Sequence, residues 1–242
     1  MSATSTPRMP RRSLRFRRFV VATVALTLLY GGVTILSRQS FFRVQQITVV
    51  GNAHETAGQI IAMSHLDEHP PMLTLNARAI SEAVSQLRWV EKVDVTRQWP
   101  HRVTLTVTER RPVAVAPDFA GVLHLVDGEG RSLDPAPVGV NLPHLAAVGP
   151  DGPWPFDRWA KPAATVARRL PAAFRAQVAS VSVDVKGRVT MHFTTPVTFY
   201  LGQTENLHAK FVAVASVIAG QVLRPNSYVD VSVPSAVTVE VR

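Results

Sequence analysis

The apolar residues of this chain follow three patterns in three successive stretches. From Phe19 to Leu36 apolar residues predominate and none of the 18 residues carries a formal charge. From 42 to 111 short alternating runs, typical of strands, enclose two stretches in which apolar residues recur at helical spacing. From 112 to 242 alternating runs predominate. These patterns predict one long apolar helix followed by two regions of mixed secondary structure.

The apolar stretch predicts a transmembrane helix over 19–38. As an α-helix, 18 residues rise about 27 Å, close to the roughly 30 Å hydrocarbon core of a bilayer. Six arginines precede this stretch and only Arg38 and Arg43 follow it closely. The positive-inside rule therefore makes residues 1–18 a basic cytoplasmic tail and places the rest of the chain outside the cytoplasm.

Two alternatives to a retained anchor stay open. Residues 11–16 loosely resemble a twin-arginine export signal, and basic residues before an apolar run also occur in cleaved signal peptides. Against cleavage, the apolar run is longer than a usual signal core, and no A-x-A site follows it. A retained anchor is the favoured prediction.

The stretch from 42 to 111 predicts the order β-α-α-β-β. Its first strand ends at the turn pair Gly51-Asn52. Two helices follow, the first ended by Pro70-Pro71 and the second capped by Asn76. Two alternating strands on either side of a turn at Pro100 close the stretch.

The stretch from 112 to 242 predicts a β-rich domain whose sheet is covered by helices. Short strands flank a D-G-E-G hairpin turn at 127–130, and the Pro- and Gly-rich segment 135–162 is predicted to be a surface loop. A helix over 205–219 covers the sheet through an apolar stripe made of Leu207, Phe211, Val214 and Ile218. The overall fold class is therefore α+β.

The basic character of the chain belongs to one end. The formal net charge is +9, but eight arginines lie in residues 1–43 and the remaining 199 residues carry a net charge of only +1. This distribution fits a membrane-topology signal and argues against nucleic-acid binding. The chain has no cysteine, which excludes disulfides, thiolate metal sites and cysteine nucleophiles.

The candidate chemistry is sparse. His65-Leu66-Asp67-Glu68-His69 matches an H-x-x-E-H metalloprotease pattern, but Pro70 and Pro71 follow at once and favour a solvated turn. Asp127 and Glu129 are interpreted as solvated turn residues. No nucleophile elbow, P-loop or dinucleotide fingerprint is present. The sequence therefore predicts no catalytic residue, no metal site and no cofactor, and the chain is not expected to be an enzyme.

A series of motifs, in order, resembles the FtsQ/DivIB family of bacterial cell-division proteins. The residues that resemble its POTRA domain are Phe42, Val44, Ile47, Val49, Gly51, Asn52, Leu87, Trp89, Val90, Arg97, Trp99, Pro100, Glu109, Arg110 and Pro112. Those that resemble its second domain are Leu125, Val126, Asp127, Gly130, Leu142, Pro143, Leu145, Val197, Leu201, Gly202, Val229, Asp230 and Val231. Arg88, Ala146 and Ser232 depart from the family's usual Pro, Gly and Arg.

The resemblance implies a POTRA domain over 42–111 and an FtsQ-type β domain over 112–242. It also implies a single-pass protein of the cytoplasmic membrane at the division septum, which recruits septal proteins without catalysis. In that family the final strands and the preceding helix of the β domain bind an FtsB-like subunit, which pairs with FtsL as a coiled coil, and the POTRA domain docks other divisome proteins. Ser232 stands where that contact would have an Arg.

The C-terminal residues offer a physical basis for such binding. Val237, Val239 and Val241 alternate with polar residues, which predicts a half-buried strand over 236–242 with a free edge for strand addition. The candidate partner-binding residues are Tyr228, Val229, Asp230, Val231, Ser232, Val237, Thr238, Val239, Glu240, Val241 and Arg242. Two other functions stay open: a POTRA-bearing transport component that binds extended chains by strand addition, and a secreted hydrolase.

Overall fold

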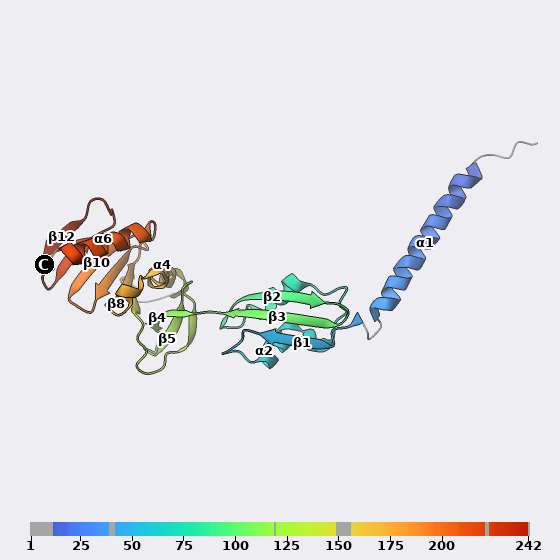
Figure 1. The fold of residues 1–242 in the computed structure, drawn as a ribbon, viewed down its shortest axis with the longest axis horizontal. Coiled ribbons are helices and arrows are strands. Elements are labelled where there is room, and N and C mark those ends of the chain that lie inside the picture. The colour runs from blue at the N-terminus through green and yellow to red at the C-terminus, as the bar shows by residue number, and fades with distance from the viewer. Residues whose placement is uncertain (1–11, 39–41, 119, 149–155, 221–222, 242) are drawn as a thin grey trace, which may run out of the picture. The chain divides into compact units, whose positions relative to one another are not determined.

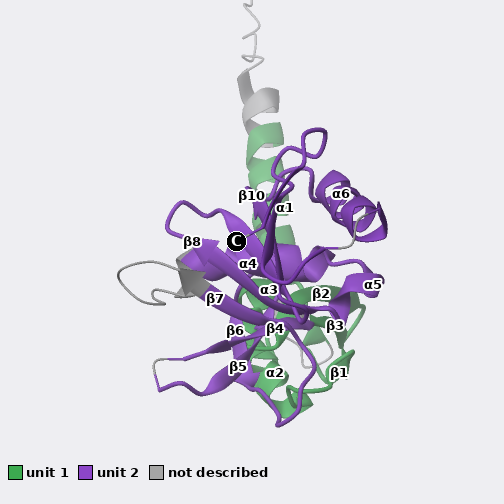
Figure 2. Cartoon of the chain, turned by 90° about the vertical axis from the view of Figure 1, so that its left-hand side faces the viewer, with its two compact units in different colours: residues 1–109 green, residues 110–242 purple. Residues whose placement is uncertain are grey.

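The computed structural model describes residues 12–38, 42–118, 120–148, 156–220 and 223–241 (Figure 1). The chain divides into two units, residues 1–109 and 110–242 (Figure 2). Each unit contains its own sheet and its own cluster of buried apolar residues. The predicted α+β class is confirmed.

The first helix, α1, runs from Arg12 to Arg38. Two of its threonines bond back to the preceding turn, since Thr23 Oγ1 donates to the Phe19 carbonyl at 2.9 Å and Thr27 Oγ1 to the Thr23 carbonyl at 2.8 Å. Among the residues that the structure describes, no helix is both long enough and apolar enough to cross a membrane. Residues 1–11 of the predicted basic tail lie outside the described residues.

A three-stranded sheet with the order β1-β3-β2 forms the core of the first unit. Its strands are β1 (Gln46–Val50), β2 (Val90–Gln98) and β3 (Arg102–Glu109), and its helical segments are α2 (Ala57–Ser64), η2 (Leu66–Glu68) and α3 (Ala77–Val84). The strand β3 pairs parallel with β1 and antiparallel with β2. Ile60 of α2 and Val84 of α3 are fully buried against the sheet. The predicted order β-α-α-β-β is therefore confirmed.

Local capping explains where these helices begin. The side chain of Asn76 accepts the N–H groups of Arg78 and Ala79, as the sequence predicted. Thr56 and Gln59 form a reciprocal capping box at the start of α2. His65 and His69 both adopt the left-handed conformation, with φ of 54° and 52°. The H-x-x-E-H pattern is thus split by a 3₁₀ turn, and no continuous helix presents its two imidazoles.

A partly buried carboxylate ties the end of β3 to the turn that follows β1. Glu109 Oε1 accepts the N–H groups of Ala53 and His54 at 2.6 and 2.9 Å, and its Oε2 lies 2.7 Å from His54 Nδ1. The imidazole of His54 stacks on Trp89 with ring centroids 3.6 Å apart. Partial burial by itself raises the pKa of Glu109, but these hydrogen bonds outweigh it and hold the pKa below its ordinary value.

We expect Glu109→Gln to destabilise the first unit by about 1 kcal/mol at neutral pH, because charge-assisted hydrogen bonds are replaced by neutral ones. A carboxylate whose pKa is lowered by folding contributes stability above its unfolded pKa, and loses that contribution as the pH falls through the folded value. The difference between variant and parent should therefore begin to shrink as the pH falls through the ordinary pKa of glutamate, about 4.3, and vanish once the pH lies below the lowered pKa of the folded state. Urea unfolding at several pH values measures it. The exposed Glu91→Gln is the control, and a penalty that persists in acid contradicts the assignment.

The second unit is built on a nine-stranded sheet with the order β12-β11-β10-β9-β8-β7-β4-β5-β6. Its strands are β4 (Pro112–Pro117), β5 (Leu123–Asp127), β6 (Ser132–Pro135), β7 (His144–Val148), β8 (Val178–Asp184), β9 (Val189–Phe193), β10 (Val197–Gly202), β11 (Ser227–Asp230) and β12 (Thr238–Val241). Its helices are α4 (Phe156–Arg169), α5 (Ala172–Arg175) and α6 (Leu207–Gly220).

The prediction of a surface loop over 135–162 is wrong. Within that segment β7 lies in the middle of the sheet, paired parallel with β8 and joined to β4, and Leu145 is buried. The helix α4 begins at Phe156 and packs on the sheet through small side chains such as Ala163 and Ala164. A five-residue strand with two alanines and a helix with an alanine face carry little local hydrophobic signal, so pairing and packing decide both elements.

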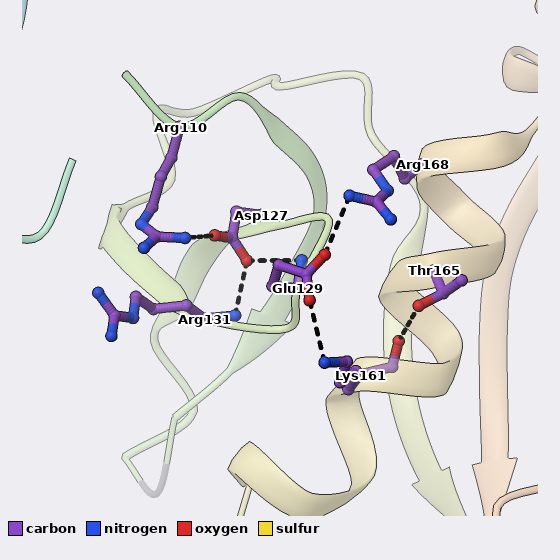
Figure 3. A network of polar contacts seen from close by, with 7 residues as sticks. All are labelled: Arg110, Asp127, Glu129, Arg131, Lys161, Thr165 and Arg168. Carbon is purple, nitrogen blue, oxygen red and sulfur yellow. Dashed lines mark hydrogen bonds and ion pairs between the residues drawn. The ribbon is translucent and has the colours of Figure 1, made fainter. Parts of the chain in front are cut away.

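The hairpin between β5 and β6 is held by two carboxylates (Figure 3). Asp127 is only 3% exposed; its Oδ2 accepts Arg110 Nη1 at 2.6 Å and its Oδ1 accepts two backbone N–H groups of the turn. Glu129 pairs with Lys161 and Arg168 of α4, each at 3.0 Å, and the hydrogen bond from Lys161 lowers the pKa of Glu129. The prediction that Asp127 is a solvated turn residue is therefore wrong.

Candidate partner-binding edge

The last three strands of the nine-stranded sheet form one of its edges. The strand β11 pairs parallel with β10 and antiparallel with β12, so that Tyr228 lies opposite Glu240 and Val229 opposite Val239. Within the described strands β12 has a single neighbour, β11. One side of its backbone therefore faces away from the sheet.

The hydrogen-bond direction along β11 identifies the outward groups of β12. The N–H of Val231 donates to the Tyr200 carbonyl on β10 at 2.9 Å. Because these directions alternate along a strand, the N–H groups of Tyr228 and Asp230 point to β12 instead. Glu240 and Thr238 lie opposite those two residues. It follows that the N–H and C=O of Val239 point to the outer edge.

All four residues of β12 are exposed, so the prediction that this strand is half-buried is wrong. The three valines do share the face that carries α6, because Val239 lies opposite the buried Val229. Val237 packs partly against the core, but Val239 is 37% exposed and Val241 is 58% exposed. How far a helix reaches over the last strand is a tertiary property that the alternating pattern does not contain.

The other candidate residues divide into three groups. Val229 and Val231 are fully buried, so they anchor the edge from within the core. Tyr228 and Asp230 are half-buried on the opposite face, where Tyr228 stacks on Tyr200 with ring centroids 6.2 Å apart. Ser232 donates its N–H to Asp230 Oδ1 and lies close beside Gly202. Arg242 lies outside the described residues.

A groove beside β12 was not predicted from the sequence. It has a volume of about 710 Å³, and its lining includes Val212 and Ser216 of α6 together with Pro234 and Val237. The predicted stripe of α6 is correct for Leu207, Phe211 and Val214, which are buried, whereas Val217 is buried in place of Ile218. Val212 on the outward side of this helix is the one local signal that could have revealed the groove.

A buried cation lies where α6 meets the end of β10. Lys210 of α6 donates from Nζ to the carbonyls of Leu201 and Gln203, at 2.8 and 2.7 Å. Burial lowers the pKa of Lys210 below its ordinary value. The two bonds fasten α6 to the end of β10 and so fix the helix that borders the groove.

A serine and a histidine meet on the other face of the sheet. Ser182 Oγ lies 3.0 Å from His192 Nε2, and Thr198 Oγ1 lies 3.3 Å from His192 Nδ1. Burial lowers the pKa of His192. A Ser-His-acid triad needs a carboxylate at the second ring nitrogen. A threonine hydroxyl occupies that place here. The arrangement therefore lacks the carboxylate that orients a catalytic imidazole and stabilises its protonated form.

Comparison with known proteins covers most of the chain. The FtsQ-type POTRA domain matches residues 42–110, and the C-terminal domain of cell division protein FtsQ/DivIB matches residues 114–232. The second match ends before β12. It includes the whole of β11 and the part of the edge that is anchored in the core.

Curated relatives match over similar lengths. Cell division protein FtsQ of Streptomyces bingchenggensis is 30% identical, over 95% of this chain and 86% of the relative. Cell division protein FtsQ of Streptomyces venezuelae is 28% identical, over 91% of this chain and 82% of the relative. Cell division protein FtsQ of Mycolicibacterium smegmatis is 26% identical, over 98% of this chain and 68% of the relative. The chain belongs to the FtsQ/DivIB family of bacterial cell-division proteins.

Proposed function

We propose that this chain is a non-enzymatic scaffold of the divisome, and that its β12 edge binds an FtsB-like subunit by strand addition. The observation that carries the proposal is the outer edge of β12, where Val239 directs its N–H and C=O away from the sheet. An extended segment of a partner can complete this ladder. The exposed valines and the adjoining groove give such a segment apolar surface to cover.

The same proposal places the bulk of the chain outside the cytoplasmic membrane at the division septum. Residues 1–18 would form the cytoplasmic tail and 19–38 the membrane span, followed by a POTRA domain over 42–111 and the β domain over 112–242. The span is supported by the uncharged apolar run from Phe19 to Leu36. The arginines that precede Phe19 supply the orientation signal. Other divisome proteins, including an FtsL-like subunit paired with the FtsB-like one, complete the assembly.

Deletion of residues 236–242 from the full chain tests this function. We expect recovery of an FtsB-like subunit with the tagged protein to fall at least about tenfold, since the strand that pairs with the partner is gone. Cells that depend on the truncated chain should elongate without septation. A Val241→Thr variant keeps every backbone group of β12 and serves as the matched control. Normal recovery of the subunit together with normal septation contradicts the proposal.

A further inference from the structure

The three-stranded sheet has one end at which the chain enters from α1. Gln46, the first residue of β1, lies opposite Arg102, the first residue of β3. The N–H groups of Gln45 and Gln46 donate to the His101 carbonyl at 2.9 and 3.2 Å. The turn between β2 and β3, residues 99–101, therefore lies beside the point where the chain enters this sheet (Figure 1).

A second loop closes the same end. The N–H of Met72 donates to the Phe42 carbonyl at 2.8 Å, and the N–H of Val44 donates to the Pro70 carbonyl at 3.1 Å. Arg43 also pairs in an isolated bridge with Pro71. The segment 69–73 and the turn 99–101 are thus both fastened to residues 42–46.

Large apolar side chains project from both loops. Trp99 is 54% exposed, whereas Trp89 at the other end of the sheet is buried. Leu73 is 52% exposed, although its neighbours Met72 and Leu75 are buried. Neither Trp99 nor Leu73 belongs to the buried apolar cluster of this unit. Such side chains at a loop tip are typical of a surface that meets an apolar phase or partner.

Charged groups flank these apolar tips. Arg97 and Arg102 are exposed on the two strands that lead to Trp99, and Arg43 lies at the chain entry. Asp67 and Glu68 are the exposed acids of the neighbouring η2 segment. Three arginines against two carboxylates leave this end weakly positive. Guanidinium groups beside a tryptophan suit a lipid headgroup layer, in which phosphates accept their hydrogen bonds.

The tether to α1 is too short to hold this end far from the end of the helix. Only residues 39–41 separate α1 from Phe42, whose carbonyl is already bonded to Met72. A fully extended chain from Arg38 to Phe42 reaches about 14 Å. The headgroup layer on one side of a bilayer is roughly 5–8 Å thick. A helix that spans the membrane therefore keeps this end of the sheet at the bilayer surface.

We propose that this end of the sheet rests on the outer leaflet of the membrane. Trp99 and Leu73 enter the boundary between headgroups and acyl chains, and Arg97 and Arg102 bond to lipid phosphates. The inference rests on the proposed membrane span of α1. It adds a second attachment beside that helix, which fixes how the POTRA domain is rotated about its tether.

The absence of cysteine from the chain makes a site-specific test direct. Gln98→Cys places a nitroxide next to Trp99, and Gln86→Cys places the same label beyond α3, toward the end of the sheet where Trp89 lies. Both glutamines are exposed, so the two substitutions are matched. The labelled full chain is reconstituted in vesicles of phosphatidylethanolamine and phosphatidylglycerol. Collision rates with oxygen and with a water-soluble nickel chelate then report the depth of each label.

We expect the label at 98 to collide with the nickel chelate several-fold less often than the label at 86, and more often with oxygen. Adding Trp99→Ser or Leu73→Ser should move the label at 98 toward aqueous values. Equal, aqueous values at 98 and 86 in protein that floats with the vesicles overturn the inference and leave the membrane span intact. Protein that does not float with the vesicles overturns the span and this inference together.

Discussion

Replacing Gly130 by alanine is expected to lower the unfolding temperature of the second unit by about 10 °C. Gly130 has φ of +84°, and a Cβ built on it would lie 2.7 Å from the backbone nitrogen of Lys161 and 3.0 Å from the carbonyl carbon of Ala160. The left-handed conformation costs alanine about 1–2 kcal/mol, and forcing α4 outward costs about 1–3 kcal/mol more. A loss of about 3 kcal/mol in a unit of this size corresponds to that shift.

Gly187→Ala is the matched control. Gly187 also has a positive φ, +75°, but a Cβ on it would meet nothing within 4 Å. This variant should lose only the conformational part, about 1 kcal/mol. Thermal unfolding of the two variants and the parent, followed by circular dichroism, gives the comparison. Equal losses for both variants contradict the close approach of the β5–β6 turn to α4.

The geometry of this turn explains why one motif of the family contains an aspartate and a glycine. In the sequence, Asp127 and Gly130 belong to a predicted D-G-E-G hairpin turn and to a motif that resembles the family's. In the structure the Asp127 carboxylate binds the N–H groups of its own turn and the guanidinium of Arg110, while Gly130 lets the turn pass against the α4 backbone. Both residues hold the hairpin, and Glu129 between them reaches α4. A pattern of turn residues could not distinguish this arrangement from a solvated turn.

The sequence predicted those elements whose signal is local. The cap at Asn76 and the alternation of Val103, Leu105 and Val107 depend on neighbouring residues, and the structure confirms both. The paired strands β2 and β3 then bring these valines onto one face with Val93. The order of elements in the first unit could therefore be derived from periodicity and turn chemistry alone.

Elements decided by distant contacts could not be derived in this way. The strand β7 is stabilised between β8 and β4, and its alanines give no strand signal by themselves. How much of β12 is buried depends on how far α6 extends over the last strands. In the folded unit Val241 remains exposed. The groove beside Val212 arises because α6 and the turn before β12 come together only in the folded unit.

Substituting proline for Val239 is expected to weaken binding of an FtsB-like subunit more than tenfold. The N–H of Val239 points to the outer edge, where the proposed partner strand would accept it. Proline removes that donor, and its ring blocks close approach of the neighbouring backbone. One hydrogen bond contributes about 1 kcal/mol net to the binding free energy, and the loss of close backbone approach weakens binding further. A loss of about 1.4 kcal/mol in binding free energy already lowers the affinity tenfold. Proline is tolerated on an edge strand when its nitrogen faces outward, so β12 should stay paired with β11.

If a partner strand completes the ladder along β12, the affinity of the Val239→Pro variant must fall. Val239→Thr keeps the N–H and the branched side chain, so it should bind within about threefold of the parent. Protection of the Glu240 amide from hydrogen exchange checks that β12 remains in the sheet in both variants. We expect a loss of more than tenfold for proline and almost none for threonine. Binding of the proline variant at parental affinity, with β12 still paired, would contradict strand addition along β12.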